Sequence, residues 1–300
     1  MSHQFLNKMK SLYKIIILLS VALTPVSMYA QEDSVSVNTA CVPVRTVSYD
    51  DLAFGPGERM SFAIHYKWGV INSDVGSATV ELDTLTFNGI RSFKCTAHGR
   101  TAKFYDMFFK VRENFQSWFS CDGLVPLKFM RDTKEGNYTA RNTYVYNWSS
   151  SEPHIAADVY TSNLGEMSMQ IPLTRCTYDL PALFYFSRNM DVENIEPGRR
   201  YPMTFAIDDE VFNVYFILHG RETIKVKGLG TVKTIRFAAK LLEGEVFKGE
   251  EDMTIWISDD ENRIPVYFEA PLIVGKATGR MTDCNGLKYP FTSLVNDIRK

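Results

Sequence analysis

The sequence predicts a mainly β protein, built as one strongly curved antiparallel sheet (a half-barrel or barrel-like form) with one packed helix near residues 179–190. Apolar residues alternate with smaller or polar ones over many segments, as in Phe62, Ile64, Tyr66 and Trp68. This period of two is typical of half-buried strands. Turn residues separate the segments at intervals of about 10–14 residues, as in antiparallel sandwiches and barrels. A hydrophobic content of 45% and 13% aromatic residues are typical of a packed core.

The first half of the chain is a succession of such segments, separated by turn residues such as Asn88-Gly89 and Asp122-Gly123. Residues 103–109 interrupt the alternation with several aromatic side chains, and we expect one or two helical turns there. The expected strands are 61–68, 75–84, 91–101, 111–121, 127–134, 138–148, 154–162 and 167–173.

A helix is expected at 179–190, between two strand-rich halves. Asp179 stands where an N-cap belongs, and Pro181 lies in the first turn, where its missing N–H is harmless. The residues three, four and seven positions after Leu180 share one face with it, so the helix should pack one side onto the sheet.

The second half of the chain returns to strand-like alternation. No flexible linker divides the two halves, so we expect residues 51–300 to form a single β-rich domain. Its halves cover about 51–175 and 195–295 and are joined by the helix. The expected strands of the second half are 201–207, 211–219, 222–227, 232–241, 253–258, 264–270 and 273–282.

The first thirty residues have the order of regions of a secretory signal peptide. Three lysines precede a mainly apolar run at 15–23, and the small residue Ala30 precedes a polar stretch. The run is well short of the roughly 20 residues that span a bilayer as a helix, although a retained anchor is the alternative. We therefore expect cleavage near Ala30, a location in the periplasm or outer cell envelope, and a flexible lead-in at 31–50.

The charge of the exported chain argues against some partners. Removal of residues 1–30 would take three lysines and no acid, which lowers the formal net charge from −2 to −5. Such a chain as a whole has no electrostatic attraction for nucleic acid or for an anionic membrane face. No second hydrophobic segment is long enough to cross a membrane as a helix, so no transmembrane span is expected in the mature chain.

The five cysteines, Cys41, Cys95, Cys121, Cys176 and Cys284, all lie beyond the expected signal peptide. Export allows disulfide bonds to persist, and the odd number leaves at least one thiol. Cys95 and Cys121 are the first candidates for a disulfide bond, because they lie in strand-like segments separated by one short helical stretch. Buried free cysteines are the alternative, since the spacing matches no small disulfide scaffold.

The sequence contains no G-x-S-x-G, H-E-x-x-H, P-loop or G-x-G-x-x-G motif in a suitable context. His65, His98, His154 and His219 are scattered among strands, where a lone histidine is more often structural than catalytic. Residues 259–262 resemble a fragment of a calcium loop without its remaining ligands, so a turn is expected there. No C-x-x-C is present, and we expect neither a metal nor a cofactor.

Aromatic residues are the one enrichment that points to a site. Most of them fit a hydrophobic core, which is the simpler interpretation. The alternative is an apolar cavity on the concave side of the sheet, closed by the helix, with Phe104, Phe108 and Phe109 at its mouth. The candidate ligand-binding residues are Trp68, Phe104, Tyr105, Phe108, Phe109, Trp118, Phe184 and Tyr185.

Several segments carry a family resemblance. They are Gly-Glu-Arg at 57–59, Trp-Gly-Val at 68–70, Asp-Met-Phe-Phe-Lys-Val-Arg-Glu at 106–113, Gly-Leu-Val-Pro at 123–126, Asp-Leu-Pro-Ala-Leu-Phe-Tyr at 179–185, Trp-Ile-Ser-Asp-Asp-Glu-Asn-Arg-Ile-Pro-Val at 256–266, and Gly275. Together they span nearly the whole mature chain and resemble a group of bacterial exported proteins catalogued only as a domain of unknown function. The resemblance implies an envelope location and a mainly antiparallel β fold. It supplies no established activity and no catalytic residues, and half-barrel carriers of lipids or lipoproteins are similar at the level of shape alone.

Three classes of function follow from these observations. The first is a non-catalytic envelope protein that binds an apolar small molecule or a lipid in its curved sheet. The second is a structural or interaction module that docks another envelope protein through an apolar patch or an open sheet edge. The third is a hydrolase, which would require acids and His98 or His219 to converge in one cleft.

Overall fold

The computed structural model describes residues 48–174, 176–208, 210–239, 253–272 and 275–298. The expected signal peptide and nearly all of the expected lead-in lie outside the described residues. Among the described residues, no helix has the length and apolar character needed to span a bilayer.

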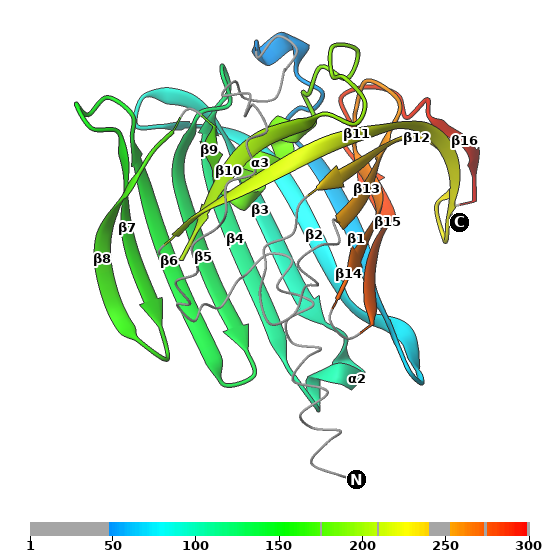
Figure 1. The fold of residues 1–300 in the computed structure, drawn as a ribbon, viewed down its shortest axis with the longest axis horizontal. Coiled ribbons are helices and arrows are strands. Elements are labelled where there is room, and N and C mark those ends of the chain that lie inside the picture. Colours follow the sequence, from blue (N-terminus) through cyan, green and yellow to red (C-terminus); the bar gives the residue numbers. More distant parts are fainter. Residues whose placement is uncertain (1–47, 175, 209, 240–252, 273–274, 299–300) are drawn as a thin grey trace.

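The described chain forms one curved sheet of sixteen strands that is not closed into a barrel (Figure 1). Its neighbours follow the order β8-β7-β6-β5-β4-β3-β2-β1-β15-β14-β13-β12-β11-β10-β9, and β16 pairs with β12. The strands are β1 (Glu58–Trp68), β2 (Ile71–Phe87), β3 (Ile90–Thr101), β4 (Val111–Ser120), β5 (Pro126–Glu135), β6 (Tyr138–Asn147), β7 (His154–Thr161), β8 (Gly165–Pro172), β9 (Thr177–Tyr178), β10 (Arg200–Ile207), β11 (Glu210–Val226), β12 (Gly230–Ala239), β13 (Met253–Ser258), β14 (Pro265–Pro271), β15 (Lys276–Asn285) and β16 (Leu294–Asp297).

Two meanders make up this sheet. Strands β1–β8 pair in chain order, as do β9–β15, and β1 joins the two meanders by pairing with β15. The pairings are antiparallel, except that β9 runs parallel to β10. The prediction of a strongly curved, mainly antiparallel sheet is therefore confirmed.

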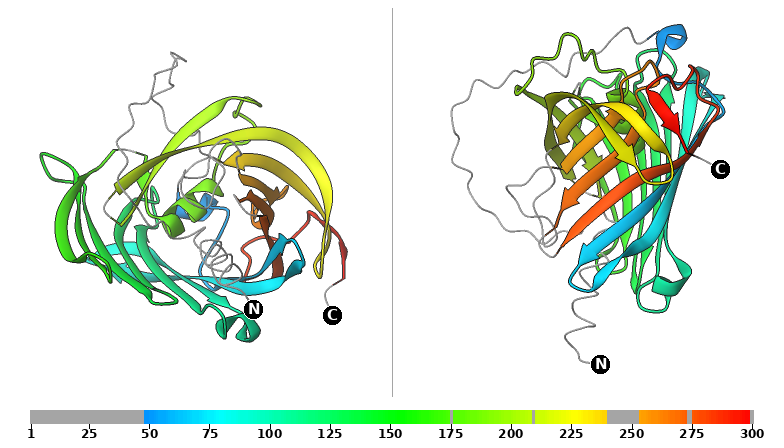
Figure 2. Two further views of the ribbon diagram at one scale, coloured as in Figure 1. Left: turned by 60° about the horizontal axis from the view of Figure 1, so that its bottom comes forward. Right: turned by 90° about the vertical axis from the view of Figure 1, so that its right-hand side faces the viewer.

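The helices are short. A 3-10 turn at Tyr49–Asp51 precedes β1, α2 (Lys103–Asp106) follows β3, and α3 (Leu180–Ser187) follows β9. Helix α3 lies within the concavity of the sheet, as Figure 2 shows. The expected helix near 179–190 is confirmed, and the expected helical turns at 103–109 are confined to α2 and the turn after it.

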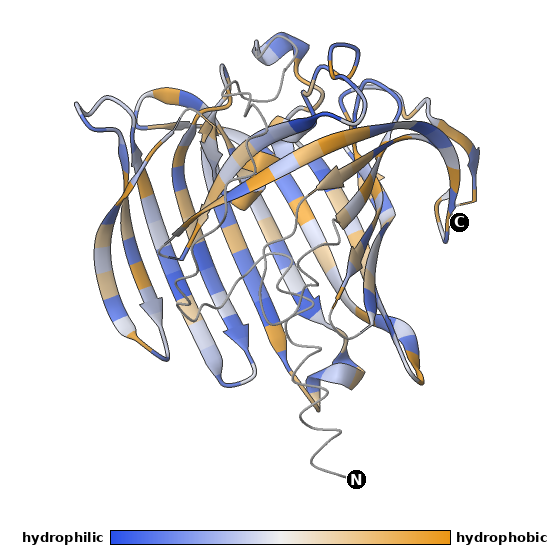
Figure 3. Cartoon of the chain, viewed as in Figure 1, coloured by the Kyte–Doolittle hydropathy of each residue, from blue (hydrophilic) through white to orange (hydrophobic). Residues whose placement is uncertain are grey.

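Hydrophobic and hydrophilic residues alternate along many of the strands, as the sequence predicts (Figure 3). Successive side chains of a strand point to opposite faces of the sheet, so this alternation gives the two faces different character. Across seven strands, the register aligns one row of side chains on the concave side. This row consists of Leu82, Cys95, Ser117, Phe129, Tyr144, Ala157 and Met169. All but Met169 are buried, so the core of the molecule lies inside the curve.

The strand predicted at 211–219 and the strand predicted at 222–227 are one strand, β11. The gap between these two predicted strands contains a β-bulge at Gly220, because the register with β12 shifts between Leu218 and Gly220. Its φ of 131° suits a residue without a Cβ. The bulge lets a strand of 17 residues bend around the core instead of reversing direction.

The predicted disulfide bond between Cys95 and Cys121 is wrong. Both residues are free thiols and fully buried in the main core. Cys95 lies in mid-strand on β3 and Cys121 directly after β4, where each acts as a small apolar side chain. Among the described cysteines, Cys176 is the one that forms a disulfide bond.

Candidate functional site

The concave face of the sheet holds the features that could bind a ligand or a partner. Helix α3 covers its central part by packing on β3, β4 and β10. The ring of Tyr185 on this helix lies 4.7 Å from that of Phe54 and 5.9 Å from that of Phe119, measured between centroids. This part of the concavity is filled by protein side chains and is core.

Asp179 fixes the start of α3 in the concavity. Its Oδ1 accepts a hydrogen bond of 2.9 Å from the backbone N–H of Ala182, which confirms the predicted N-cap. Its Oδ2 accepts bonds from the hydroxyl groups of Ser117 and Tyr146, at 3.0 and 3.2 Å. Full burial raises the pKa of this carboxyl to about 7, because the charged form has lost its hydration.

A buried ion pair fixes the other end of the helix. The guanidinium group of Arg188 donates to the two carboxylate oxygens of Glu58, at 2.5 and 2.8 Å. It also donates to the carbonyl oxygens of Asn262 and Ala53. Both charged side chains are buried. The pair joins α3 to β1 and to the turn after β13, so it has a structural role.

The hairpin of β10 and β11 lies across the concave face of β5 and β6. The carboxylate of Asp208, at its tip, accepts bonds from Arg131 at 2.7 Å and from Asn142 at 2.8 Å. Tyr144 donates its hydroxyl proton to the backbone carbonyl of Asp208 at 2.5 Å. Behind them, Thr133 donates to the carboxylate of Glu113. Burial raises the pKa of Glu113 well above its usual range.

Beyond this hairpin, the concave face of β6–β8 is apolar. Tyr144, Ile155, Val159 and Ile171 are buried there with neighbours from β3–β5. The apolar side chains that flank this cluster are only partly buried. They include Trp148, Met167, Met169, Leu173 and Val211. We refer to this partly exposed apolar surface, next to the edge of β8 that pairs with no other described strand, as the β8 wing.

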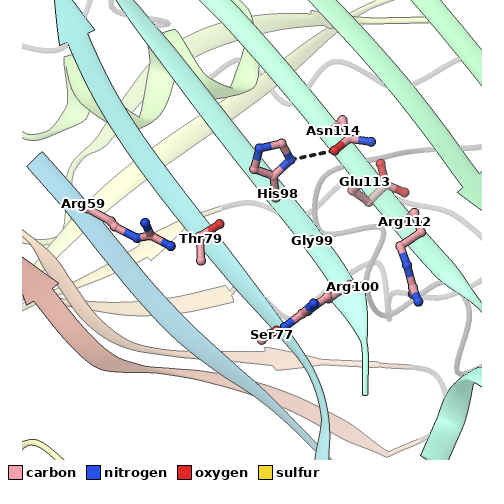
Figure 4. Close-up of a pocket in the computed structure, with 9 residues that line it drawn as sticks. All are labelled: Arg59, Ser77, Thr79, His98, Gly99, Arg100, Arg112, Glu113 and Asn114. Atoms are coloured by element: carbon pink, nitrogen blue, oxygen red, sulfur yellow. Dashed lines mark hydrogen bonds between the residues drawn. The ribbon is translucent and has the colours of Figure 1, made fainter. Parts of the chain in front are cut away.

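A polar hollow of about 480 Å³ lies on the opposite, convex face, over β1–β4 (Figure 4). Its lining includes Arg59, His98, Arg100 and Arg112. Arg59 pairs with Glu81 at 3.1 Å, and Arg112 pairs with Asp106. These partners neutralise two of its cations, and no described group in it resembles a catalytic set.

The four histidines expected in the mature chain do not converge. His65 lies beside Asp74 and Asn72 on β1 and β2. His98 contacts Asn114 on the convex face, at 2.6 Å. His154 contacts Asn147, and His219 lies exposed on β11. The convergence that a hydrolase would require is therefore not seen for His98 or His219 within the described part of the chain.

The structure separates the predicted ligand-binding residues into three groups. Phe184 and Tyr185 belong to the main core on α3. Trp118 lies on the convex face, between the ammonium groups of Lys94 and Lys128. Trp68 and Tyr105 flank a small second core, and Phe104 and Phe108 lie exposed at one end of the sheet, where the ring of Phe109 packs against Gly136. They do not line one cavity.

Sequence reasoning missed the residues of the hairpin contact and of the β8 wing. The only signal for the wing was the alternation of Met167, Met169 and Ile171 along a segment already identified as a strand. Nothing in the sequence indicates that Asp208 meets Arg131 and Asn142, because this contact joins residues 77 and 66 positions apart.

Comparison with solved structures supports the fold. The chain is similar to a β-barrel-like protein of the domain of unknown function DUF1849 from Brucella abortus, with a TM-score of 0.51 and 10% identity over 83% of this chain and 100% of that one. It also matches a protein described as a "putative lipoprotein" from Parabacteroides distasonis, with a TM-score of 0.28 and 10% identity over 78% and 99% of the two chains. The first of these similarities shows the fold alone.

No curated protein matches the sequence. The model of one family, described as a protein of unknown function (DUF3108), matches residues 61–282. This match runs from β1 to β15, and so includes both meanders and the joint between them. The chain therefore belongs to the DUF3108 family.

Proposed function

We propose that this chain is an exported protein of the bacterial envelope that binds an apolar, lipid-like ligand without catalysis. The observation that carries the proposal is the β8 wing, where large apolar side chains on the concave face remain partly exposed. Methionine side chains such as those of Met167 and Met169 adapt to ligands of varied shape. An acyl chain that covers them would gain about 0.8 kcal/mol for each CH₂ group removed from water.

The position of the wing supports a ligand of this kind. The sheet ends at β8, and within the described residues no further strand pairs with that edge. The apolar surface therefore lies beside an open margin through which an elongated ligand could enter. The polar contact of Asp208 with Arg131 and Asn142 limits the wing toward the centre of the molecule.

A second candidate function rests on the same open edge. A strand whose outer edge has no described partner presents unpaired backbone groups, and an extended segment of another protein could add to it. This arrangement supports an interaction module that docks another envelope protein. The two candidates differ in what they need, because strand addition uses the backbone of β8 and lipid binding uses its concave side chains.

The experiment uses matched variants on the two faces of β8. Met167→Asp with Met169→Asp places charge on the concave face, whereas Ser168→Asp with Gln170→Asp places it on the exposed opposite face. Each protein is purified from its native envelope and studied by native mass spectrometry, with lipid extraction of the same sample.

If the protein binds lipid, we expect a stoichiometric lipid on the wild type and on the Ser168/Gln170 variant. We expect none on the Met167/Met169 variant. A wild-type protein that carries no lipid contradicts lipid binding. If this lipid-free protein co-purifies with another protein, and a Pro substitution in β8 abolishes that association, strand addition is the better interpretation. Sequencing of the purified N-terminus checks the expected cleavage near Ala30.

A further inference from the structure

The topology brings four connections of the first meander to one end of the sheet. Because β1–β8 alternate in direction, the turns after β1, β3, β5 and β7 meet at the same end (Figure 1). We define the lower rim as these turns, which comprise residues 69–70, 102–110, 136–137 and 162–164.

The lower rim carries the most exposed large apolar side chains of the described chain. Val70 is 98% exposed, Met107 73%, Leu164 72% and Phe104 61%. Phe108 adds a fifth side chain at 48%. Three of these five side chains, Phe104, Met107 and Phe108, lie within one turn of the chain. An exposed cluster of apolar side chains often marks a site of protein or membrane interaction.

Helix α2 and the turn after it hold three of these side chains outward. Tyr105 points back to the sheet, where its hydroxyl group is hydrogen-bonded to that of Ser73. Asp106 also points back and binds the guanidinium group of Arg112 through two hydrogen bonds, of 2.9 and 2.5 Å. With these two residues anchored, Phe104, Met107 and Phe108 project from the end of the sheet. The rings of Phe104 and Phe108 support each other, with centroids 5.6 Å apart.

The charge around these tips is positive. Lys67, Lys103, Lys110 and Lys134 are exposed at or beside the lower rim, and no ion pair within the described residues engages them. The nearby acids already have cationic partners: Asp106 pairs with Arg112, Asp74 with Arg280, and Glu269 with Lys276. Glu166, next to the turn at 162–164, is an exposed acid close to the rim for which no ion pair within the described residues is found. The net local charge therefore favours an anionic partner.

We propose that the lower rim docks onto an anionic lipid bilayer, with its apolar tips inserted among the lipid headgroups. Apolar side chains flanked by lysines bind such surfaces by burial of the tips and by attraction of each lysine to the lipid charge. A negative whole-chain charge does not prevent this, because electrostatic attraction is screened within about 10 Å and depends on the local charge. The proposal goes beyond ligand binding and holds whether or not the β8 wing is occupied.

The test measures co-sedimentation with vesicles for a chain that begins at Gln31, after the expected cleavage near Ala30. Starting there removes the apolar segment at 15–23, which could bind vesicles by itself. The vesicles contain phosphatidylethanolamine and phosphatidylglycerol at 3:1, or phosphatidylcholine alone. The apolar variant is F104S/M107S/F108S, the charge variant is K103E/K110E, and the control is I90S/V125S/V145S.

The control variant changes the same number of exposed apolar side chains, at the opposite end of the sheet and on its outer face. We expect wild type and control to bind the anionic vesicles and to bind phosphatidylcholine weakly. The apolar and charge variants should each bind the anionic vesicles at least tenfold more weakly. Near-ultraviolet circular dichroism checks that each variant is folded, and if one fails to fold, the other decides the test.

Two outcomes overturn the proposal. The first is a wild type that does not bind anionic vesicles; if the same protein is a dimer that the apolar variant dissociates, the lower rim is instead a contact between two copies. The second is vesicle binding that both rim variants leave unchanged.

Discussion

At the scale of single residues, the buried ionisable groups around α3 stabilise a specific arrangement of helix and sheet. Asp179 is the clearest case, because one side chain caps the helix and accepts hydrogen bonds from β4 and β6. Its carboxyl has no cationic partner among the hydrogen bonds and ion pairs of the described residues. Burial therefore dominates its titration.

Asp179 should make the stability of the protein depend on pH. Its pKa is raised to about 7 in the folded state by burial, against 3.8 as the ordinary value. Between these values the folded state holds a proton that the unfolded state has released. The free energy of unfolding should therefore decrease as pH rises from about 4 to about 7, by at most about 1.4 kcal/mol per pH unit.

Asp179→Asn should remove this contribution, since an amide can still cap the helix but does not titrate. Denaturant unfolding of wild type and variant at pH 5 and pH 8 measures the effect. The free energy of unfolding of the variant should fall below that of wild type by more at pH 5 than at pH 8. A stability difference that is the same at both pH values would contradict the assignment.

The Arg188–Glu58 pair should tolerate loss of one partner poorly. Arg188→Met leaves the Glu58 carboxylate buried without its cation, and we expect a loss of about 3–5 kcal/mol in the free energy of unfolding. The double variant Glu58→Leu with Arg188→Met should lose less free energy of unfolding than the two single variants lose together. Equilibrium unfolding in urea measures all three, and strict additivity would show that the pair is not coupled.

The thiols of Cys95 and Cys121 should be unreactive in the folded protein. Both are fully buried, and burial raises their pKa values, which suppresses the reactive thiolate. Iodoacetamide should label the two residues only in concentrated guanidinium chloride, as mapped by peptide mass spectrometry. A peptide linked through Cys95 and Cys121 in a digest prepared without reductant would contradict this assignment.

At the scale of elements, the contact between the β10–β11 hairpin and the first meander depends on Asp208. This residue has a φ of 53°, which asparagine also tolerates, so Asp208→Asn removes the charge and keeps the turn. We expect the free energy of unfolding to decrease by about 1–3 kcal/mol, because Arg131 would remain buried without its closest anion.

Hydrogen exchange localises this effect. The amides of β10 and of the first half of β11 should lose more protection than those of β12 in the Asp208→Asn variant. Asp283→Asn, which alters an exposed side chain on β15, serves as the control. Equal loss of protection throughout the sheet would show that the hairpin does not open as a separate unit.

How far the elements could be predicted depended on whether their signals were local. Asp179 and Pro181 indicated the start of α3 because a helix cap is determined by neighbouring residues. The division of β11 into strands at 211–219 and 222–227 was wrong because a bulge and a turn both favour glycine, and only the pairing of Gly220 with β12 distinguishes them. Similarly, the aromatic enrichment indicated burial, but not the face of the sheet on which each ring such as Trp118 would lie.

At the scale of the whole molecule, the curvature of the sheet was predictable from strand rhythm, but whether the sheet closes and where the two meanders join were not. The pairing of β1 with β15 needs partners from opposite ends of the chain. The sites were least predictable. Net charge argued against membrane attraction for the whole chain, whereas the proposed role of the lower-rim lysines depends on their local grouping, which only the topology reveals.

The joint should be sensitive to added volume at Gly279. This residue pairs with Ile64 of β1 on one side and with Phe268 of β14 on the other. A Cβ at this position would lie 1.9 Å from the Phe268 ring, so Gly279→Ala should destabilise the protein by about 1–3 kcal/mol.

Gly55→Ala is the matched control, because its new Cβ would meet only the Lys288 side chain, at 3.8 Å. Thermal unfolding should show a lower midpoint for Gly279→Ala and little change for Gly55→Ala. An unchanged midpoint for Gly279→Ala would contradict this prediction and would mean that the Phe268 ring moves aside without a loss of stability.

The joint between β1 and β15 also governs the order of events during folding. Apart from the parallel pair of β9 and β10, each meander is built from hairpins whose partners are close in sequence, and such contacts form quickly. By contrast, Tyr66 must meet Ala277, about 210 positions later, so this pairing closes a very long loop. We expect it to be the slow step of folding. Until it occurs, β1 presents an open edge to other unfinished chains, so a newly made molecule is most prone to aggregate before its last long strand is available.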